Sequence, residues 1–212
     1  KVAYGESNES VAAFQQSLKD AGYFAEKPTG FFGDKTKASL VAFEADMGIT
    51  GSGTHLSDVT SVYLQATIEV KKREPKLGLI NKESTRSDIL NAQRLLRGLG
   101  YYRGRTNGAY DGYLFDAILS LQKEYKLVGD ASSPGAGPIG PLTRGIVVSL
   151  WRKSRIDALA TKMIELNQVK RLLADRGLLL DTFVAKGESG DSVRALQSFL
   201  ASAGYFPQDK IN

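Results

Sequence analysis

The sequence contains an internal repeat, and this repeat limits the folds that the chain can adopt. Residues 10–24 (SVAAFQQSLKDAGYF) align with residues 88–102 (DILNAQRLLRGLGYY), and every paired position differs by 78. The same offset still pairs Ile49 with Leu127; beyond them it becomes 83, because the second copy has five extra residues within GDASSPGAGP (129–138). A Ser/Pro/Gly-rich loop accepts such an insertion at little cost in free energy. The chain therefore contains two copies of one small fold.

Each copy has the pattern of three short helices. Val11, Phe14 and Leu18 form one apolar stripe at helical spacing, and Gly22 suits the left-handed position that ends a helix. In the first copy we expect the second helix to be capped by Asp34 and the third by Ser57 or Asp58. The second helix should carry an apolar face made of Ala38, Leu40, Val41 and Phe43. In the second copy we expect helices at about 87–99, 112–126 and 141–153.

Several motifs occur in a fixed order: SVAAFQQSLKDAGYF, TGFFGDKTKASLVAFE, GITGSG and LSDVTSVYL. Together they resemble the peptidoglycan-binding domain 1 family. The first copy departs from the family pattern at Phe14, Thr29 and Glu44, where the pattern has Leu, Asp and Gln. The second copy matches more loosely, with Asp111 and Leu114 in place of Gly and Thr. The resemblance implies a compact three-helix bundle and noncatalytic attachment to bacterial cell wall.

The fold class that we predict is all-α, with tandem small three-helix bundles joined by a charged linker and a long helix. We expect modules at 1–68 and 87–153, a linker at 69–86, a long linker helix at 154–183 ending near Gly177, and the first helix of a third, incomplete module at 184–212. The third copy rests on the near-identity of residues 184–206 with residues 2–24 at an offset of 182. A single helix cannot bury its apolar face alone, so residues 184–212 need other helices to complete their core. Three alternatives remain open: the polypeptide continues, the segment docks on the long helix, or a neighbouring molecule supplies the missing helices by self-association through 154–212.

Charge and composition restrict the partners. The net charge is +5 and the pI is about 9.3, which favours an anionic partner such as peptidoglycan or another anionic wall polymer. Arginines gather around the first helix of the second copy: Arg94, Arg97, Arg103 and Arg105. No nucleic-acid-binding signature accompanies them, so nucleic acid is not the expected partner. No apolar run reaches the roughly 18 residues that a membrane span requires.

Residue counts argue against catalysis. Zinc peptidases need at least two His ligands, and the chain has only His55, which falls in a predicted loop. Cysteine peptidases need a thiolate, and the chain has no Cys. The two modules occupy most of the chain. We therefore expect no enzyme activity, no metal and no cofactor.

The recurring residues divide into ligand-binding candidates and structural ones. The aromatic candidates for sugar or peptide contact follow the first helix and its adjacent turn, where they would form a shallow groove: Tyr23, Phe24, Phe31, Tyr101, Tyr102 and Tyr110. Core packing is the competing role for these rings. The residues with an expected structural role are Gln15, Gly22, Gly30, Gly33, Gln93, Gly100, Gly108, Gln197 and Gly204. For the glutamines we favour a buried amide that ties a loop's backbone over a bond to ligand.

The function that follows is noncatalytic binding to peptidoglycan by tandem modules of an extracellular, cell-wall-associated bacterial protein. Two alternatives remain open. The modules could serve as building blocks of a repetitive surface or filament protein. They could also be the targeting arm of a wall hydrolase whose catalytic domain lies outside this chain.

Overall fold

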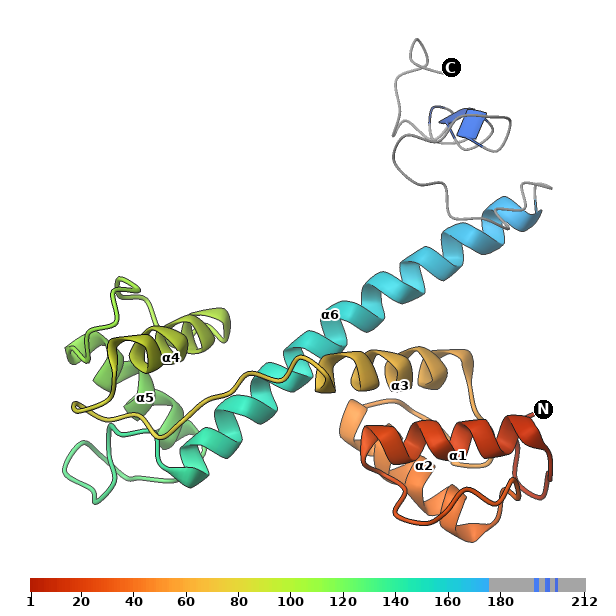
Figure 1. Cartoon of the computed structure of the whole chain (residues 1–212), viewed down its shortest axis with the longest axis horizontal. Coiled ribbons are helices and arrows are strands. Elements are labelled where there is room, and N and C mark those ends of the chain that lie inside the picture. Colours follow the sequence, from red (N-terminus) through yellow and green to blue (C-terminus); the bar gives the residue numbers. More distant parts are fainter. Residues whose placement is uncertain (176–192, 195–196, 199–200, 202–212) are drawn as a thin grey trace. The chain divides into compact units, whose positions relative to one another are not determined.

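The computed structural model describes residues 1–175, 193–194, 197–198 and 201. Within these residues it contains six named helices and, in place of sheets, three isolated β-bridges (Figure 1). The all-α prediction is therefore confirmed. The chain divides into two compact units, residues 1–160 and residues 161–212. Both repeat copies lie within the first unit.

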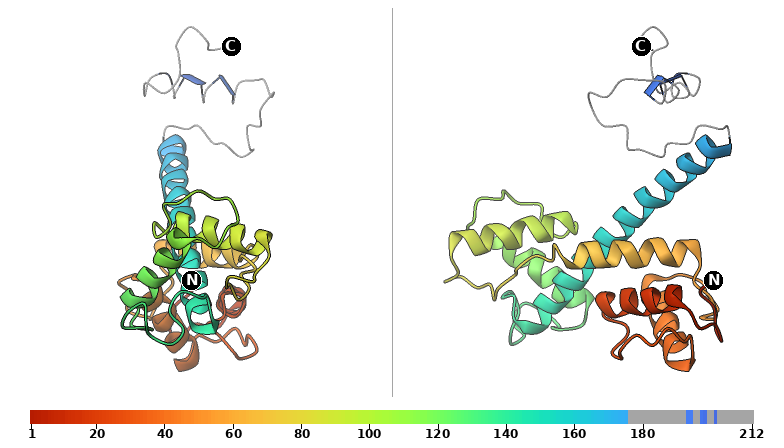
Figure 2. Two further views of the ribbon diagram at one scale, coloured as in Figure 1. Left: turned by 90° about the vertical axis from the view of Figure 1, so that its left-hand side faces the viewer. Right: turned by 45° about the vertical axis from the view of Figure 1, so that its right-hand side comes forward.

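The first copy consists of α1 (Glu9–Ala21), α2 (Asp34–Met47) and α3 (Asp58–Lys71). Helix α1 ends as predicted, because Gly22 adopts φ 99° and its N–H bonds back to the last turn. The Ser57 side chain accepts from the N–H of Thr60 and so begins α3. Helices α1 and α3 lie side by side in Figures 1 and 2. Their shared core contains Val11, Phe14, Leu18, Phe32, Leu40, Phe43 and Leu64.

Two expectations for α2 are wrong in detail. Gly33 occupies the N-cap position without a side-chain bond, and Asp34 is the first helical residue. Val41 is 45% exposed and Ala38 is also exposed, so only Leu40 and Phe43 of the predicted apolar face are buried. The buried residues of α2 are Thr36, Leu40, Phe43 and Glu44, which form one narrow stripe at helical spacing, and Ala38 and Val41 fall outside it.

The second copy consists of α4 (Arg86–Gly98), α5 (Gly112–Glu124) and the first part of α6 (Pro141–Asp175). Thr85 and Asp111 cap α4 and α5 by accepting from the N–H groups of Asp88 and Leu114. The core of this copy contains Ile89, Leu96, Tyr102, Leu114, Ile118, Leu121, Ile139 and Val147, together with Leu77 and Ile80 from the predicted linker. The segment before α4 therefore contributes to the second core and is more than a connection.

Helix α6 has 35 residues and runs without interruption through residues 150–155 (LWRKSR). The sequence had predicted two helices here, the last helix of the second module and the long linker helix. No Gly or Pro lies at this junction to stop the helix. Gly177, Gly204 and most of the predicted third copy lie outside the described residues. No helix among the described residues is long and apolar enough to cross a membrane.

Candidate functional site

The turn between α1 and α2 is held by Gln15, which is 1% exposed. Its Nε2 donates to the carbonyl of Phe31 and to Oγ1 of Thr36, both at 2.8 Å. Its Oε1 accepts from the N–H groups of Thr29 at 2.8 Å and Gly30 at 2.9 Å. All of the side chain's polar atoms are thus used inside the protein, as expected for a buried amide.

Gln93 has the same role in the second copy and is fully buried. Its Nε2 donates to the carbonyl of Ala109 at 2.9 Å and to the hydroxyl of Tyr102 at 3.1 Å, while its Oε1 accepts from the N–H of Gly108 at 2.9 Å. Gly30 and Gly108 both have positive φ, 81° and 73°, which a side chain would make unfavourable. The two glutamines therefore fix equivalent turns and are not available to a ligand.

A third buried amide holds the loop after α5 and was not among the residues expected to have a structural role. Gln122 donates through Nε2 to the carbonyls of Gly135 and Pro138 and to Oγ1 of Thr143, and it accepts from the N–H of Gly137. The signal that could have revealed it is the polar residue at one position of both second helices, Glu44 in the first copy and Gln122 in the second.

Two of the six candidate aromatic rings are core residues. Phe24 is 6% exposed and Tyr102 is 2% exposed, so neither presents a face to a ligand. The hydroxyl of Tyr102 donates to the carbonyl of Arg105 at 2.6 Å, and burial raises the pKa of this phenol. Tyr110 packs against the same core, and burial raises its pKa to about 12.

Tyr23 and Tyr101 are equivalent, half-buried rings whose hydroxyls donate to carboxylates. Tyr23 bonds Asp46 at 2.8 Å, and Tyr101 bonds Glu124 at 2.9 Å. Burial and these hydrogen bonds raise the pKa of each tyrosine to about 12. Tyr101 also lines a pocket of about 390 Å³.

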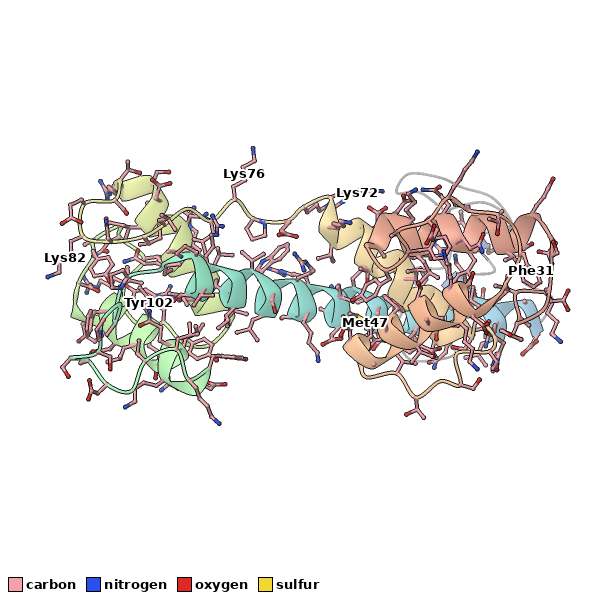
Figure 3. The ribbon with its side chains drawn as sticks, turned by 90° about the horizontal axis from the view of Figure 1, so that it is seen from below. Phe31, Met47, Lys72, Lys76, Lys82 and Tyr102 are labelled. Atoms are coloured by element: carbon pink, nitrogen blue, oxygen red, sulfur yellow. The ribbon has the colours of Figure 1, made fainter. Side chains whose placement is uncertain are left out.

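Phe31 is the exposed ring of the candidate set, with 52% of its surface accessible (Figure 3). It precedes the N-terminus of α2, whereas Tyr23 packs edge-on against Phe43 and bonds Asp46 near the C-terminus of the same helix. Helix α2 has 14 residues and is therefore about 20 Å long. In the first copy, Phe31 and Tyr23 therefore lie at opposite ends of α2 and do not form the single aromatic groove expected from the sequence.

The larger pocket lies in the second copy and is polar. It has a volume of about 670 Å³ and is lined by residues from the end of α4, the turn at 103–107 and the start of α5. Arg97, Arg103 and Arg105 line it together with Asp111 and Tyr113. Three of the four arginines noted in the sequence thus face one concave surface, and Tyr113 at its edge is 69% exposed.

The part of the chain that the structure describes contains no group of three or more His, Asp and Glu side chains able to hold a metal ion. His55 is exposed, and its backbone pairs with Ala3 in an isolated bridge.

Residues 7–54 and 85–131 match the family described as "Putative peptidoglycan binding domain". The chain contains two domains of this family. Searches of curated proteins and of solved structures found no match to this chain. The two matched segments contain α1 with α2 and α4 with α5, the two turn-fixing glutamines, Phe31 and the arginine-lined pocket. Tandem peptidoglycan-binding domains imply an association with the cell wall.

Proposed function

We propose that the two peptidoglycan-binding domains attach this protein to bacterial peptidoglycan without catalysing a reaction. The observation that carries this proposal is the presence of two family domains in tandem. Two weak sites on one chain bind a repetitive polymer more tightly than either alone, because the second contact forms at a high effective concentration. Since peptidoglycan lies outside the cytoplasmic membrane, the proposal includes secretion of the protein.

The absence of catalysis rests on the composition of the sequence. With one His and no Cys, the chain lacks the side chains for a His-ligated zinc centre or a thiolate nucleophile. Wall binding should accordingly need no metal. The possibility that the domains target a catalytic domain encoded elsewhere in a longer protein is compatible with this proposal.

Co-sedimentation with purified, insoluble peptidoglycan tests the proposal. We expect the full chain to pellet with the polymer, to release no soluble fragments from it, and to bind equally well in excess EDTA. Protein that stays in the supernatant would contradict wall binding. Binding that EDTA abolishes and a divalent ion restores would contradict the metal-free mode.

Phe31 and His55 provide a matched comparison within the first domain, since both side chains are exposed and truncation of either leaves the core intact. A ring with an apolar face can stack on a sugar, so Phe31→Ala should weaken binding more than His55→Ala does. Equal effects of the two substitutions would remove Phe31 from the site.

Self-association is a second candidate function, and one feature of α6 favours it. Leu166, Val169 and Leu172 are 49%, 39% and 51% exposed, and their spacing of three residues places them along one side of the helix. A building block of a surface assembly would sediment as an oligomer and would stay in the supernatant with peptidoglycan. A wall-binding monomer gives the opposite result in both assays.

A further inference from the structure

The arginine-lined pocket of the second domain has no assigned role. We propose that Arg97, Arg103 and Arg105 form an oxyanion site that binds a carboxylate of a peptidoglycan peptide stem. This inference rests on the proposed function, because it names the chemical group of the polymer that the second domain recognises. The pocket's volume of about 670 Å³ lies within the range of about 300–1,000 Å³ typical of small-ligand sites.

Side-chain hydrogen bonds hold the backbone of the turn that carries two of these arginines. The Tyr102 hydroxyl donates to the carbonyl of Arg105 at 2.6 Å, Arg97 donates to the carbonyl of Gly104, and Arg86 Nε donates to the carbonyl of Asn107 at 3.1 Å. At the end of the turn, the N–H of Gly108 donates to Gln93. The carbonyls of Gly104, Arg105 and Asn107 are therefore each bonded by a side chain. The Arg97 guanidinium takes part in holding the turn, whereas those of Arg103 and Arg105 form none of these bonds.

Arg103 and Arg105 are exposed, and no described carboxylate forms an ion pair with either of them. Asp111 is the acidic residue in the lining, and its Oδ1 accepts from the N–H of Leu114 at the start of α5. Arg97 lies over the Tyr102 ring, 5.7 Å from its centroid. The pocket thus brings three guanidinium groups together with one carboxylate, and none of the three arginines forms an ion pair among the described residues.

The equivalent turn of the first domain carries its own counter-ion. There, Glu26 pairs with Lys35 at 2.6 Å, and its carbonyl accepts from Lys19 at 3.2 Å. At the offset of 78, the second domain has Gly104 in place of Glu26. A Cβ added at Gly104 would lie 2.7–2.9 Å from atoms of the Tyr102 ring, so an acidic side chain could return only if that buried ring moved. The second domain therefore has no carboxylate at this position, and the Tyr102 ring occupies the space that a side chain there would need.

A carboxylate of peptidoglycan is the ligand that fits this arrangement. A guanidinium group matches a carboxylate with two parallel hydrogen bonds, and such charge-assisted bonds are the strongest that a partly wet site offers. Within peptidoglycan, the carboxylates belong to the peptide stems, whereas the N-acetylated sugars are uncharged. Tyr113 stands at the edge of the same pocket and can pack against the stem next to its carboxylate.

The test uses the full chain and a synthetic peptide with the sequence of the stem, together with the same peptide amidated at its carboxylates. We expect Arg103→Ala/Arg105→Ala to weaken binding of the free-acid peptide by about tenfold to a hundredfold, as loss of charge-assisted bonds does. The matched control is Arg94→Ala/Arg144→Ala, which removes two exposed arginines outside the pocket and should change the affinity less than about twofold. The amidated peptide should bind the wild-type protein weakly. Its affinity should not exceed that of the free-acid peptide for the pocket variant, Arg103→Ala/Arg105→Ala.

Co-sedimentation with intact peptidoglycan separates failure of this site from failure of the proposed function. If wild type pellets with peptidoglycan and both double variants bind the free-acid peptide as wild type does, the oxyanion site is wrong and wall binding stands. Equal binding of the free and amidated peptides would also overturn the site. If the protein binds neither peptidoglycan nor peptide, both proposals fail. If the pocket variant loses binding only to a phosphate-bearing wall polymer, the carboxylate assignment is overturned.

Discussion

Glu44 offers a direct test of how the two domains hold their second loop. The side chain is 3% exposed; its Oε1 accepts from the Thr60 hydroxyl at 2.9 Å, but its Oε2 has no hydrogen-bond partner among the described residues. Its counterpart Gln122 uses both ends of its amide, donating to two loop carbonyls and accepting from Gly137. We predict that Glu44→Gln stabilises the first domain, because an amide supplies the donors that the carboxyl lacks.

The magnitude follows from the one unpaired oxygen. A buried polar atom without a partner costs about 1–3 kcal/mol of folding free energy. The loop backbone lies within reach, since a Cβ added at Gly51 would overlap the Glu44 carboxyl. We therefore expect Glu44→Gln to raise the free energy of unfolding of the first domain by about 1–3 kcal/mol. Amides in α2 should then exchange about 5- to 150-fold more slowly.

Hydrogen exchange followed by mass spectrometry on the full chain measures both domains in one sample. Peptides from α2 and from residues 49–56 report the effect, and peptides from α5 serve as the internal control. The reverse substitution, Gln122→Glu, should accelerate exchange in α5 and leave α2 unchanged. If Glu44→Gln leaves α2 exchange unchanged or faster while Gln122→Glu has its expected effect, then the Glu44 carboxyl is not an unsatisfied group.

Three further predictions follow from the hydrogen bonds. Gln93→Ala leaves buried groups of the 107–110 turn unpaired, so it should lower the free energy of unfolding of the second domain by about 3 kcal/mol, measured by urea unfolding. Arg152→Ala should cost less than about 1 kcal/mol in the same assay, because its pair with Glu74 at 2.7 Å is partly exposed. Tyr23 and Tyr101 have folded-state pKa values of about 12, above the ordinary value of 10.0. Their contribution to stability is therefore complete below pH 10 and is lost between pH 10 and 12, where phenolate absorbance and circular dichroism should change together; complete phenolate formation near pH 10 in the folded protein would contradict these values.

The architecture could be read from the sequence wherever two copies could be compared. The offset of 78 identifies α1 with α4 and α2 with α5, and it places Gln15 and Gln93 at one position of the fold. The buried role of these amides also follows from physical chemistry, because a polar residue that recurs on an apolar face needs a partner inside the protein.

The candidate site could be predicted only in part. Phe24 and Tyr102 follow the same helix-ending turn as Tyr23 and Tyr101, but periodicity does not tell which ring of each pair turns inward. The full length of α6 was not predicted from the sequence. The last helix of the second module and the segment after it were expected to be two helices, but no Gly or Pro separates them and the helix continues. The 670 Å³ pocket depends on the path of the 103–107 turn, which only the structure supplies.

The two domains share the residues that fix the turn but differ in the side chains that the turn exposes, so under the proposed function they would contact different groups of the polymer. Gln15 and Gln93 hold their turns through backbone atoms, so the side chains of those turns are free to vary without loss of the fold. At the equivalent positions, the first domain has an exposed Phe31 and the second has Ala109; the first has Glu26 beside its lysines and the second has Gly104 beside its arginines. The first turn thus has an exposed apolar ring and an acidic residue paired with a lysine, and the second has guanidinium groups that form no ion pair among the described residues. On one polymer of sugars and charged peptides, such a pair of surfaces would engage different parts of the same strand, and their linkage in one chain would favour sites where both parts are present.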